Sequence, residues 1–403
     1  MLNELIEIEA AKRLVLERVS PLPNEEVAIT GALGRVLGAD VESADDVPAF
    51  DNSAMDGFAL QAGDTQQAEL PVRLPITDES RAGRPATATL ESGQAIRIST
   101  GAALPSGADS VVRVEDTTTE GEQVEVSVAV QESTNVRRAG EDVSRGDLVL
   151  RRGTILGAAE LGVLAAVGRA SAVCARRPTT AVLMTGDELQ EPSEAPRPGG
   201  VRNANAHTVP ALAALAGAEV THTATVPDDA GATRAAIEQR LEHDVVLISG
   251  GVSVGVHDHV RPTLSELGVE QVFWGVALRP GKPSWFGVHP DGALVFGLPG
   301  NPVSAIVAFL LFARPAIQAL LGATADPTRA HAIFDEAYEK QAGRAHVLRC
   351  RLELRDDGWH ATPTKEQGSH ILTSMVGADA LAVIPTESEG VAAGDRVAIE
   401  LLP

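Results

Sequence analysis

The spacing of apolar residues changes several times along this chain, and each change predicts a different kind of structure. In residues 1–26 apolar side chains recur at helical spacing, which predicts an amphipathic helix that ends before Pro21. In residues 27–143 short runs alternate apolar and polar side chains with a period of two, which predicts a β-rich domain. Residues 144–177 return to a helical pattern, and we expect them to form one discontinuous connecting domain with the N-terminal helix.

From residue 178 onward, short apolar runs alternate with helical patterns, which is the order of a parallel sheet with right-handed crossovers. The expected strands are residues 180–184, 218–226, 245–249, 275–278 and 293–298, and the expected helices are residues 206–218 and 231–242. We predict that this α/β domain covers residues 178–326. In residues 327–403 the pattern is β-like again, with Asp-Asp-Gly and Ala-Gly-Asp turns that are typical of a small barrel or sandwich.

Three glycine turns follow apolar runs of strand length within the α/β domain. They are Ser249-Gly-Gly-Val-Ser-Val-Gly255, Arg279-Pro-Gly-Lys-Pro-Ser284 and Leu298-Pro-Gly-Asn-Pro-Val-Ser304. Because ligands of open α/β sheets bind beyond the carboxyl ends of the strands, we expect the three turns to face one crevice. In the third turn Asn301 is suited to cap a helix and Pro302 to occupy its first position, so that free N–H groups would form an anion site. Pro315 should kink or break that helix.

Composition narrows the choice of partners and compartment. The net charge of −22 disfavours nucleic acid and anionic membranes as partners. Only four residues are lysines, and one of them, Lys282, lies in a glycine turn, so an anion site would have to gather scarce cations. Two distant cysteines argue against a disulfide framework or a thiolate zinc site. The acidic N-terminus lacks the features of a signal peptide and no uninterrupted apolar run reaches membrane-spanning length, so we expect a cytoplasmic protein.

Acidic, hydroxyl and basic residues share the expected sheet edge. They are Asp187, Glu188, Asp228, Ser253, Asp258, Arg279, Lys282 and Ser304. Carboxylates with hydroxyls suit Mg²⁺, whereas arginine and lysine beside backbone N–H groups suit phosphate or another oxyanion. Acid and base at one edge therefore favour phosphoryl chemistry, although solvated loops and helix caps would produce the same pattern. The sequence has no motif of the P-loop kinases, Rossmann dehydrogenases or zincins.

One loop of the β-rich domain also carries polar groups among apolar ones. Phe50, Met55 and Phe58 flank the carboxylates of Asp51 and Asp56. A loop rich in Asp and Asn is usually only a turn. Apolar flanks indicate partial burial, however, and a buried carboxylate needs a partner, for which a ligand is one choice.

Seven motifs together resemble those of the molybdopterin molybdenumtransferase family, the molybdenum insertases of bacteria, which also occur as a domain of animal gephyrin. They are Asp51-Asn-Ser-Ala-Met-Asp-Gly-Phe58, Thr100-Gly101 with Pro105 and Gly107, Gly140-Glu-Asp142, Thr185-Gly-Asp-Glu-Leu189, Ser249-Gly-Gly-Val-Ser-Val-Gly255, Pro280-Gly-Lys-Pro283 and Gly297-Leu-Pro-Gly-Asn-Pro-Val-Ser304. The resemblance spans nearly the whole chain in the right order. The sequence differs from the family pattern at Arg279, where the family commonly has lysine. The planar guanidinium group of arginine therefore replaces the compact ammonium group of lysine.

The resemblance implies an elongated homodimer of four-domain subunits that inserts molybdenum from molybdate into adenylylated molybdopterin, with a divalent cation, here Mg²⁺, and with molybdenum cofactor and AMP as products. It implies an active cleft between the α/β domain of one subunit and the β-rich domain of the other. A molybdopterin adenylyltransferase and molybdoenzymes that accept the cofactor are the implied protein partners.

The resemblance also carries residue roles onto this sequence. Asp56, Thr100, Asp142 and Glu188 match residues needed for activity, and Lys282 joins them as a catalytic residue on the oxyanion side. Asp228 and Asp258 match residues near the nucleotide and metal. Substrate-binding positions are Ser253, Arg279, Pro299, Pro302, Ser304, Arg349 and Ser369, among which Arg349 competes with Arg344 and Arg351 for its role.

The predicted fold is thus a multidomain α/β plus β architecture with a central parallel-sheet α/β domain, a β-rich domain, a discontinuous helical connecting domain and a C-terminal small β-barrel. Two other functions fit parts of the pattern. A molybdopterin adenylyltransferase would share the α/β domain but lack the β-rich domains, and it would consume ATP. A non-catalytic molybdopterin-binding or scaffold protein would bind the ligand without turnover.

Overall fold

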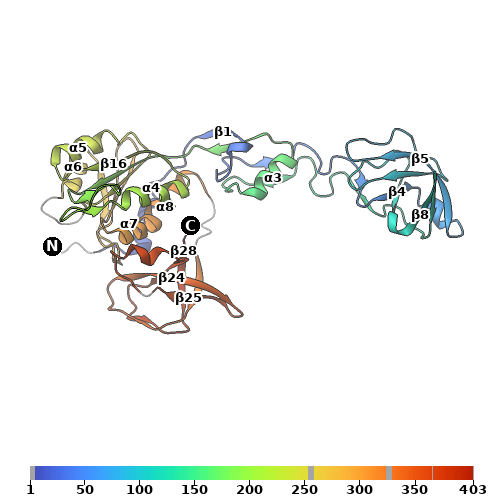
Figure 1. Cartoon of the computed structure of the whole chain (residues 1–403). Coiled ribbons are helices and arrows are strands. Elements are labelled where there is room, and N and C mark those ends of the chain that lie inside the picture. Colours follow the sequence, from blue (N-terminus) through green and yellow to red (C-terminus); the bar gives the residue numbers. More distant parts are fainter. Residues whose placement is uncertain (1–4, 253–257, 324–328, 365, 403) are drawn as a thin grey trace.

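The computed structural model describes residues 5–252, 258–323, 329–364 and 366–402. The molecule is elongated (Figure 1). The β-rich domain lies at one end, the α/β domain and the C-terminal β domain lie together at the other end, and a thinner connecting region joins the two ends. The expected combination of α/β and β domains is therefore confirmed.

A six-stranded sheet forms the centre of the α/β domain, with the strand order β16-β13-β17-β21-β20-β18. Its strands are β13 (Thr179–Thr185), β16 (Glu219–Val226), β17 (Val245–Ser249), β18 (Glu270–Trp274), β20 (Trp285–Val288) and β21 (Leu294–Leu298). The first four in spatial order are parallel, whereas β20 pairs antiparallel with both of its neighbours. All residues of β17 and β21 are buried, which explains why their sequences are apolar runs without alternation.

One predicted strand of this sheet is wrong. Residues 275–278 do not enter the central sheet; instead β19 (Leu278–Arg279) pairs with β24 (Ala345–Arg355) of the C-terminal domain. The edge is supplied by β18 and β20, neither of which was predicted. The sequence of an apolar run does not indicate whether it joins the central sheet or the sheet of the C-terminal domain, because both sheets bury apolar side chains.

Helices pack against this sheet and bring its loops together. They are α4 (Asn205–Leu215), α5 (Ala230–Glu238), α6 (Val260–Glu266), α7 (Pro302–Ala308) and α8 (Arg314–Leu320). Asp229 caps α5 by accepting a hydrogen bond from the backbone N–H of Ala232 at 2.8 Å.

A π-helical turn, η3 (Phe309–Ala313), joins α7 to α8. Pro315 follows this turn directly, and a proline interrupts the hydrogen-bond ladder one turn before its own position. The predicted irregularity near Pro315 is therefore a widened turn. The helical stretch Pro302–Leu320 is long and apolar enough to cross a membrane, but 83% of its apolar window is buried inside the protein, as in a core helix.

The β-rich domain contains a six-stranded mixed sheet with the order β7-β4-β6-β5-β9-β8. Its strands are β4 (Gly57–Leu60), β5 (Val72–Ser80), β6 (Ala95–Ile98), β7 (Ser110–Arg113), β8 (Thr117–Glu120) and β9 (Gln123–Val126). Two further short strands, β3 (Asn52–Ser53) and β10 (Val136–Arg137), pair beside it. Phe58 and Leu60 are fully buried in this core.

The connecting region is thin and mostly formed by paired strands. It contains β1 (Asn24–Ala28), β2 (Val41–Glu42), β11 (Leu148–Leu150), β12 (Ser171–Ala175) and α3 (Ala158–Ala166). The N-terminal helix α1 (Ile8–Leu16) packs elsewhere, against the helices of the α/β domain, where Ile8, Ala11 and Val15 join the main core. The domain boundaries drawn from the sequence stay a prediction.

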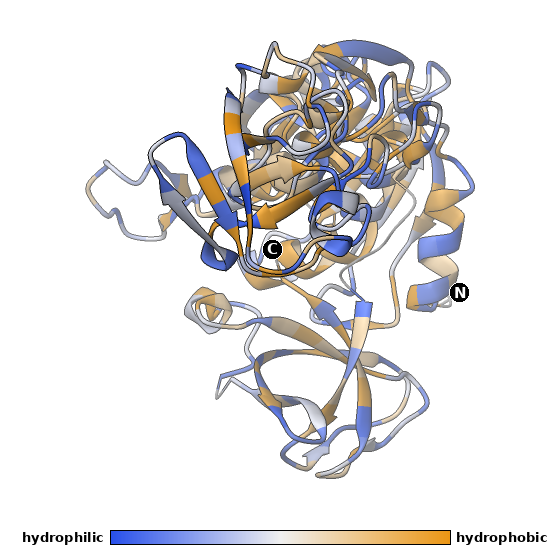
Figure 2. Ribbon diagram, turned by 90° about the vertical axis from the view of Figure 1, so that its right-hand side faces the viewer, coloured by the Kyte–Doolittle hydropathy of each residue, from blue (hydrophilic) through white to orange (hydrophobic). Residues whose placement is uncertain are grey.

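The C-terminal domain is a closed barrel, because β24 pairs with β26 as well as with β25. Its strands besides β24 are β22 (Arg329–Phe334), β25 (Gly358–Pro363), β26 (Ala380–Ile384) and β28 (Arg396–Leu401). Hydrophobic and hydrophilic residues follow one another along several strands in the lower part of Figure 2. β26 is an exception, because all of its residues are apolar. The predicted small β-barrel is therefore confirmed.

A buried ion-pair cluster joins the barrel to the helices. The carboxylate of Glu400 in β28 accepts hydrogen bonds from Lys12 Nζ at 2.9 Å and from Arg314 Nη2 at 2.9 Å. Arg329 Nε adds a third contact at 3.2 Å. The side chains of Glu400, Lys12 and Arg314 are each 7% exposed, so the cluster holds α1, α8 and the barrel together within a protected environment.

Replacing Glu400 with glutamine should lower the free energy of unfolding by about 3–5 kcal/mol, because buried cations would lose their counter-charge. Glu9 offers a matched control, since it contacts two of the same cations but is 73% exposed. We expect Glu9→Gln to cost under about 1 kcal/mol. Thermal and denaturant unfolding of both variants would measure the difference in stability. Equal losses in the two variants would contradict a stabilising role of the buried ion-pair cluster around Glu400.

Candidate functional site

A cavity of about 610 Å³ opens at the carboxyl-terminal edge of the parallel strands. The ends of β13, β17 and β21 contribute Thr185, Ser249 and Pro299 to its wall. Several of the predicted site residues line it together, namely Glu188, Asp228, Asp258, Pro299, Pro302 and Ser304. The structure therefore gathers residues more than one hundred positions apart in the sequence into one pocket.

Glycine is required where two of the turns approach each other. Gly250 has φ +95°, and a Cβ atom there would lie 2.6 Å from the carbonyl oxygen of Thr185. A Cβ atom on Gly300 would lie 3.8 Å from the Cα atom of Gly250. Side chains at these positions would strain the backbone or fill the space between the turns, so the glycines keep the floor of the cavity open to a ligand.

The acidic side of the cavity consists of Glu188, Asp228 and Asp258. The loops after β13 and β16 brace each other: Asp228 N–H donates to Asp187 Oδ1 at 3.1 Å, and Asp187 N–H donates to Asp228 Oδ2 at 3.4 Å. Asp187 thus positions the loop of Asp228. Among the residues that the structure describes, no cluster of three acidic, histidine or cysteine side chains could enclose a metal ion by itself.

The start of α7 lies against a loop of the C-terminal domain. Asn301 occupies the N-cap position and Pro302 the first turn of the helix, as predicted, but the Asn301 side chain makes no capping hydrogen bond. Instead Asn301 Nδ2 donates to Ser369 Oγ at 3.2 Å, and the N–H of Val303 donates to Ser369 O at 3.3 Å. Ser369 thereby joins the barrel to the helix start and uses one N–H group that was expected to be free.

Arg349 lies fully buried behind this loop. Its Nη2 donates to the carbonyl oxygens of Glu366 at 3.0 Å and Gly368 at 3.2 Å, and its Nε donates to Ser374 Oγ at 3.1 Å. Burial lowers the pKa of the Arg349 guanidinium. The remaining amino group, Nη1, has no hydrogen-bond partner in the described part of the chain.

The turn that carries Lys282 lies beside the cavity. Pro283 lines the cavity, and a Cβ atom on Gly281 would lie 3.8 Å from Ser304 O. Lys282 itself is exposed, and its ammonium group has no hydrogen-bond or ion-pair partner among the described residues. A cation without a counter-charge is unusual in a chain with a net charge of −22.

Arg279 extends this positive region toward the barrel, where its register partner is His346. Burial, followed by the positive charges of Arg279, Lys340 and Arg344, lowers the pKa of His346 to about 4. His346 is therefore neutral at physiological pH, with Nδ1 2.9 Å from the hydroxyl oxygen of Tyr338. Arg279, Lys340 and Arg344 thus place three positive charges around the buried imidazole of His346.

The remaining predicted catalytic residues lie in and beside the β-rich domain. Asp56 and Thr100 are brought together: Asp56 Oδ1 accepts hydrogen bonds from Thr100 N–H at 2.7 Å and from Thr100 Oγ1 at 3.1 Å. The backbone of Asp142 bonds to Val47 O at 3.0 Å, and its side chain is exposed. Within one chain the β-rich domain lies at the opposite end of the molecule from the α/β domain (Figure 1).

One predicted residue, Ser253, lies outside the described residues. Several further residues of the cavity were not predicted as site residues, among them Thr185 and Asn205. Thr185 ends β13 and Asn205 begins α4, and both line the cavity. The signal for Asn205 was weak, because an asparagine that follows a proline-rich loop and precedes a helix is usually a turn or cap residue.

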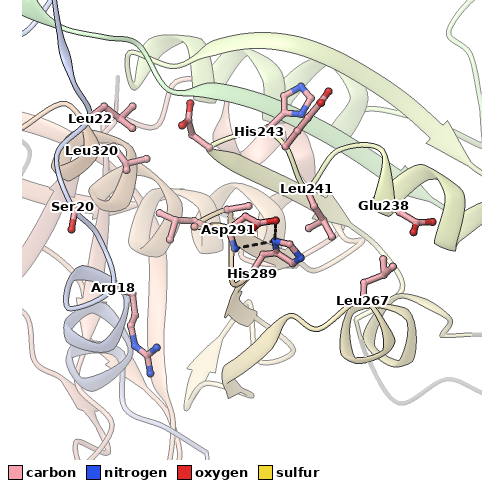
Figure 3. Close-up of a pocket in the computed structure, with 15 residues that line it drawn as sticks. Arg18, Ser20, Leu22, Glu238, Leu241, His243, Leu267, His289, Asp291 and Leu320 are labelled. Carbon is pink, nitrogen blue, oxygen red and sulfur yellow. Dashed lines mark hydrogen bonds and ion pairs between the residues drawn. The ribbon is translucent and has the colours of Figure 1, made fainter.

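A larger cavity, of about 780 Å³, lies at the opposite ends of the strands (Figure 3). Asp244 and Leu294, at the starts of β17 and β21, help to form its wall. His289 and Asp291 interact with each other at 3.5 Å, and Arg18 is paired with Glu270 outside the cavity. The cavity contains none of the predicted residues, and amino-terminal strand ends are not where α/β sheets bind ligands.

Comparison with known protein families covers most of the chain. The model of the MoeA N-terminal region (domain I and II) matches residues 6–168, and that of a probable molybdopterin binding domain matches residues 181–319. The model of the MoeA C-terminal region (domain IV) matches residues 331–402. The three matches follow one another in the order seen in the fold.

Full-length relatives are similar along the whole chain. The molybdopterin molybdenumtransferase of Haemophilus influenzae is 35% identical, covering 98% of both chains, and that of Bacillus subtilis is 34% identical, covering 98% of this chain and 94% of the relative. A crystal structure of the molybdopterin biosynthesis MoeA protein from Pyrococcus horikoshii is 31% identical and superposes with a TM-score of 0.83, covering 99% of this chain and 100% of that one.

Proposed function

Because the chain belongs to the molybdopterin molybdenumtransferase family, we propose that it inserts molybdenum from molybdate into adenylylated molybdopterin with release of AMP. Its general role is molybdenum insertion in molybdenum cofactor biosynthesis. The observation that carries the detailed proposal is one cavity with carboxylates in its wall and, beside it, the Lys282 ammonium group, which has no counter-charge among the described residues. A phosphoanhydride and an oxyanion need these two kinds of group together.

The acidic side suits a Mg²⁺ ion that is shared with the substrate. Glu188, Asp228 and Asp258 present oxygen donors to one cavity, which is the ligand type that Mg²⁺ prefers. Mg²⁺ is commonly bound by one or two carboxylates plus substrate phosphates, so a complete protein cage is not needed. When bound there, the ion would offset phosphate charge and polarise the phosphoanhydride.

The cationic side would hold molybdate. Lys282 supplies an exposed ammonium group, and Arg349 supplies a guanidinium nitrogen that has no hydrogen-bond partner among the described residues. Ser304 and Ser369 supply hydroxyls near the start of α7. Arg279 would add positive charge at the edge. These groups would orient the oxyanion near the dithiolene sulfurs of molybdopterin, so that the metal enters as AMP leaves.

The active cleft would form between two subunits of a homodimer. Asp56, Thr100 and Asp142 lie far from the cavity of their own chain, whereas an antiparallel partner of this elongated molecule could bring its β-rich domain to that cavity. In this arrangement Asp56 and Asp142 would complete the acidic side. We further propose a cytoplasmic location, with a molybdopterin adenylyltransferase as supplier of the substrate and molybdoenzymes as acceptors of the cofactor.

Incubation of the protein with adenylylated molybdopterin, Mg²⁺ and molybdate tests this function. AMP should be released only when the oxyanion is present, and chelation of the divalent cation should stop the release. Consumption of ATP with molybdopterin would instead indicate an adenylyltransferase, and tight binding without AMP release would indicate a scaffold. The full-length match, which includes the β-rich and barrel domains, does not favour these two alternatives.

A further inference from the structure

Two buried polar atoms on the wall of the cavity have no hydrogen-bond partner in the part of the chain that the structure describes. They are Oδ1 of Asn205, a residue that is 7% exposed, and Oγ1 of Thr185, a residue that is 8% exposed. Neither atom has a hydrogen-bond partner among the described residues, although both residues line the cavity. Buried polar atoms without partners cost stability, and they persist in native proteins mainly where a ligand or ordered water meets them.

The hydrogen bonds around Asn205 determine which end of its amide is free. Nδ2 lies 2.9 Å from Gly300 O, and a carbonyl oxygen can only accept. Nδ2 also lies 2.8 Å from Ser249 Oγ, whose own proton is donated to Pro299 O at 3.2 Å. Gly300 O and Ser249 Oγ therefore both accept from the NH₂ group of the Asn205 side chain. The unpaired end of Asn205 is the carbonyl oxygen, which can only accept a hydrogen bond.

The neighbouring glycines leave room beside Thr185. Cβ atoms on Gly250 and Gly251 would lie 2.8 Å and 2.9 Å from Thr185 Oγ1. A side chain at either position would cover the hydroxyl. Both glycines also line the cavity, so a ligand can approach this backbone closely.

The hydrogen-bond acceptor Asn205 Oδ1 requires a part of the substrate that carries an N–H or O–H donor. Phosphates and molybdate present oxygen acceptors, so they cannot satisfy Asn205 Oδ1. We propose that Asn205 and Thr185 bind an N–H or O–H donor on the heterocyclic or ribose portion of the substrate and thereby set its orientation on the cavity floor. This inference rests on the proposed function, and it gives the site a neutral contact that discriminates the organic part of the substrate from inorganic anions.

Thr185→Val is the sharpest test, because the substitution keeps the shape of the side chain and removes only a hydroxyl that bonds to no described residue. Titration calorimetry with AMP and steady-state kinetics with adenylylated molybdopterin would be compared with wild type. We expect binding of the portion that carries the donor to weaken about tenfold, the size of one lost neutral hydrogen bond. The midpoint of thermal unfolding should stay the same or rise, since an unpaired buried hydroxyl is removed.

The two sources of the donor give different results. Weaker AMP binding would place the donor on the nucleotide. Unchanged AMP binding with a KM for adenylylated molybdopterin raised about tenfold would place it on the pterin. Asn205→Ala should raise the same constant as Thr185→Val, either the dissociation constant for AMP or the KM for adenylylated molybdopterin. The matched control is Thr180→Val, which lies on the same strand, is fully buried and does not line the cavity, and it should move neither constant.

The proposal is overturned if Thr185→Val and Asn205→Ala both leave AMP affinity and KM at wild-type values. Its failure is separable from failure of the proposed function. Absence of AMP release by the wild-type protein would refute molybdenum insertion from the adenylylated substrate, whereas the calorimetric experiment with AMP requires no turnover.

Discussion

Replacing Lys282 with alanine is expected to reduce molybdate-dependent AMP release by at least about a hundredfold, because one preorganised charge would be lost beside the developing oxyanion site. Lys282 is one of four lysines, and its ammonium group is not neutralised by any described residue. Initial rates of AMP release, measured over a range of molybdate concentrations, would show the effect. The loss should be smaller at saturating molybdate if Lys282 mainly binds the oxyanion.

Two controls separate the role of Lys282 from a general loss of positive charge. Lys282→Arg keeps the charge with a different geometry, and it should retain more activity than alanine. Arg13→Ala removes a cation that is 70% exposed on α1, far from the cavity, and it should leave the rate unchanged. If Lys282→Ala releases AMP at the wild-type rate, Lys282 has no part in the oxyanion site.

Mixing two inactive variants should restore activity if each active cleft is built from two subunits. In Asp56→Asn the β-rich side of the cleft is damaged, and in Lys282→Ala the α/β side is damaged. Random exchange of equal amounts would give half heterodimers, and each heterodimer would contain one intact cleft. Activity should therefore rise from near zero to about a quarter of the wild-type value, by the symmetry of a closed dimer. AMP release after co-expression or subunit exchange would measure it.

A pair of variants on the same side of the cleft provides the matched control. Asp56→Asn mixed with Asp142→Asn should stay inactive, because each heterodimer would have one defect in either cleft. Restored activity in this control pair, or none in the Asp56 and Lys282 pair despite heterodimer formation, would argue against a shared cleft. Analytical ultracentrifugation of the purified protein would establish the oligomeric state on its own.

The two experiments address different links between structure and function. The first asks whether a cation beside the cavity acts on molybdate, and the second asks which chains build one cavity. The second depends on the distance in Figure 1 between the β-rich domain and the α/β domain. That distance leaves Asp56 and Lys282 of a single chain unable to act on one substrate.

The sequence by itself determined the local elements and the class of the fold. The apolar runs of β17 and β21, the glycine turns after them and Pro302 at the start of α7 follow from burial and turn chemistry that act over a few residues. Seven motifs in the right order also determined the family, since motif order survives in the sequence whatever the packing. The individual roles of the site residues stay predictions.

The tertiary structure alone decided which distant elements meet. Local pattern could not show that β19 pairs with the barrel, that Asn301 donates to Ser369, or that Arg349 lies buried behind the same loop. It also could not show that the Asn205 carbonyl oxygen is left without a partner in the cavity. Hydrogen bonds between residues about seventy to one hundred positions apart depend on how sheets, helices and barrel pack together, and that packing is a property of the whole chain.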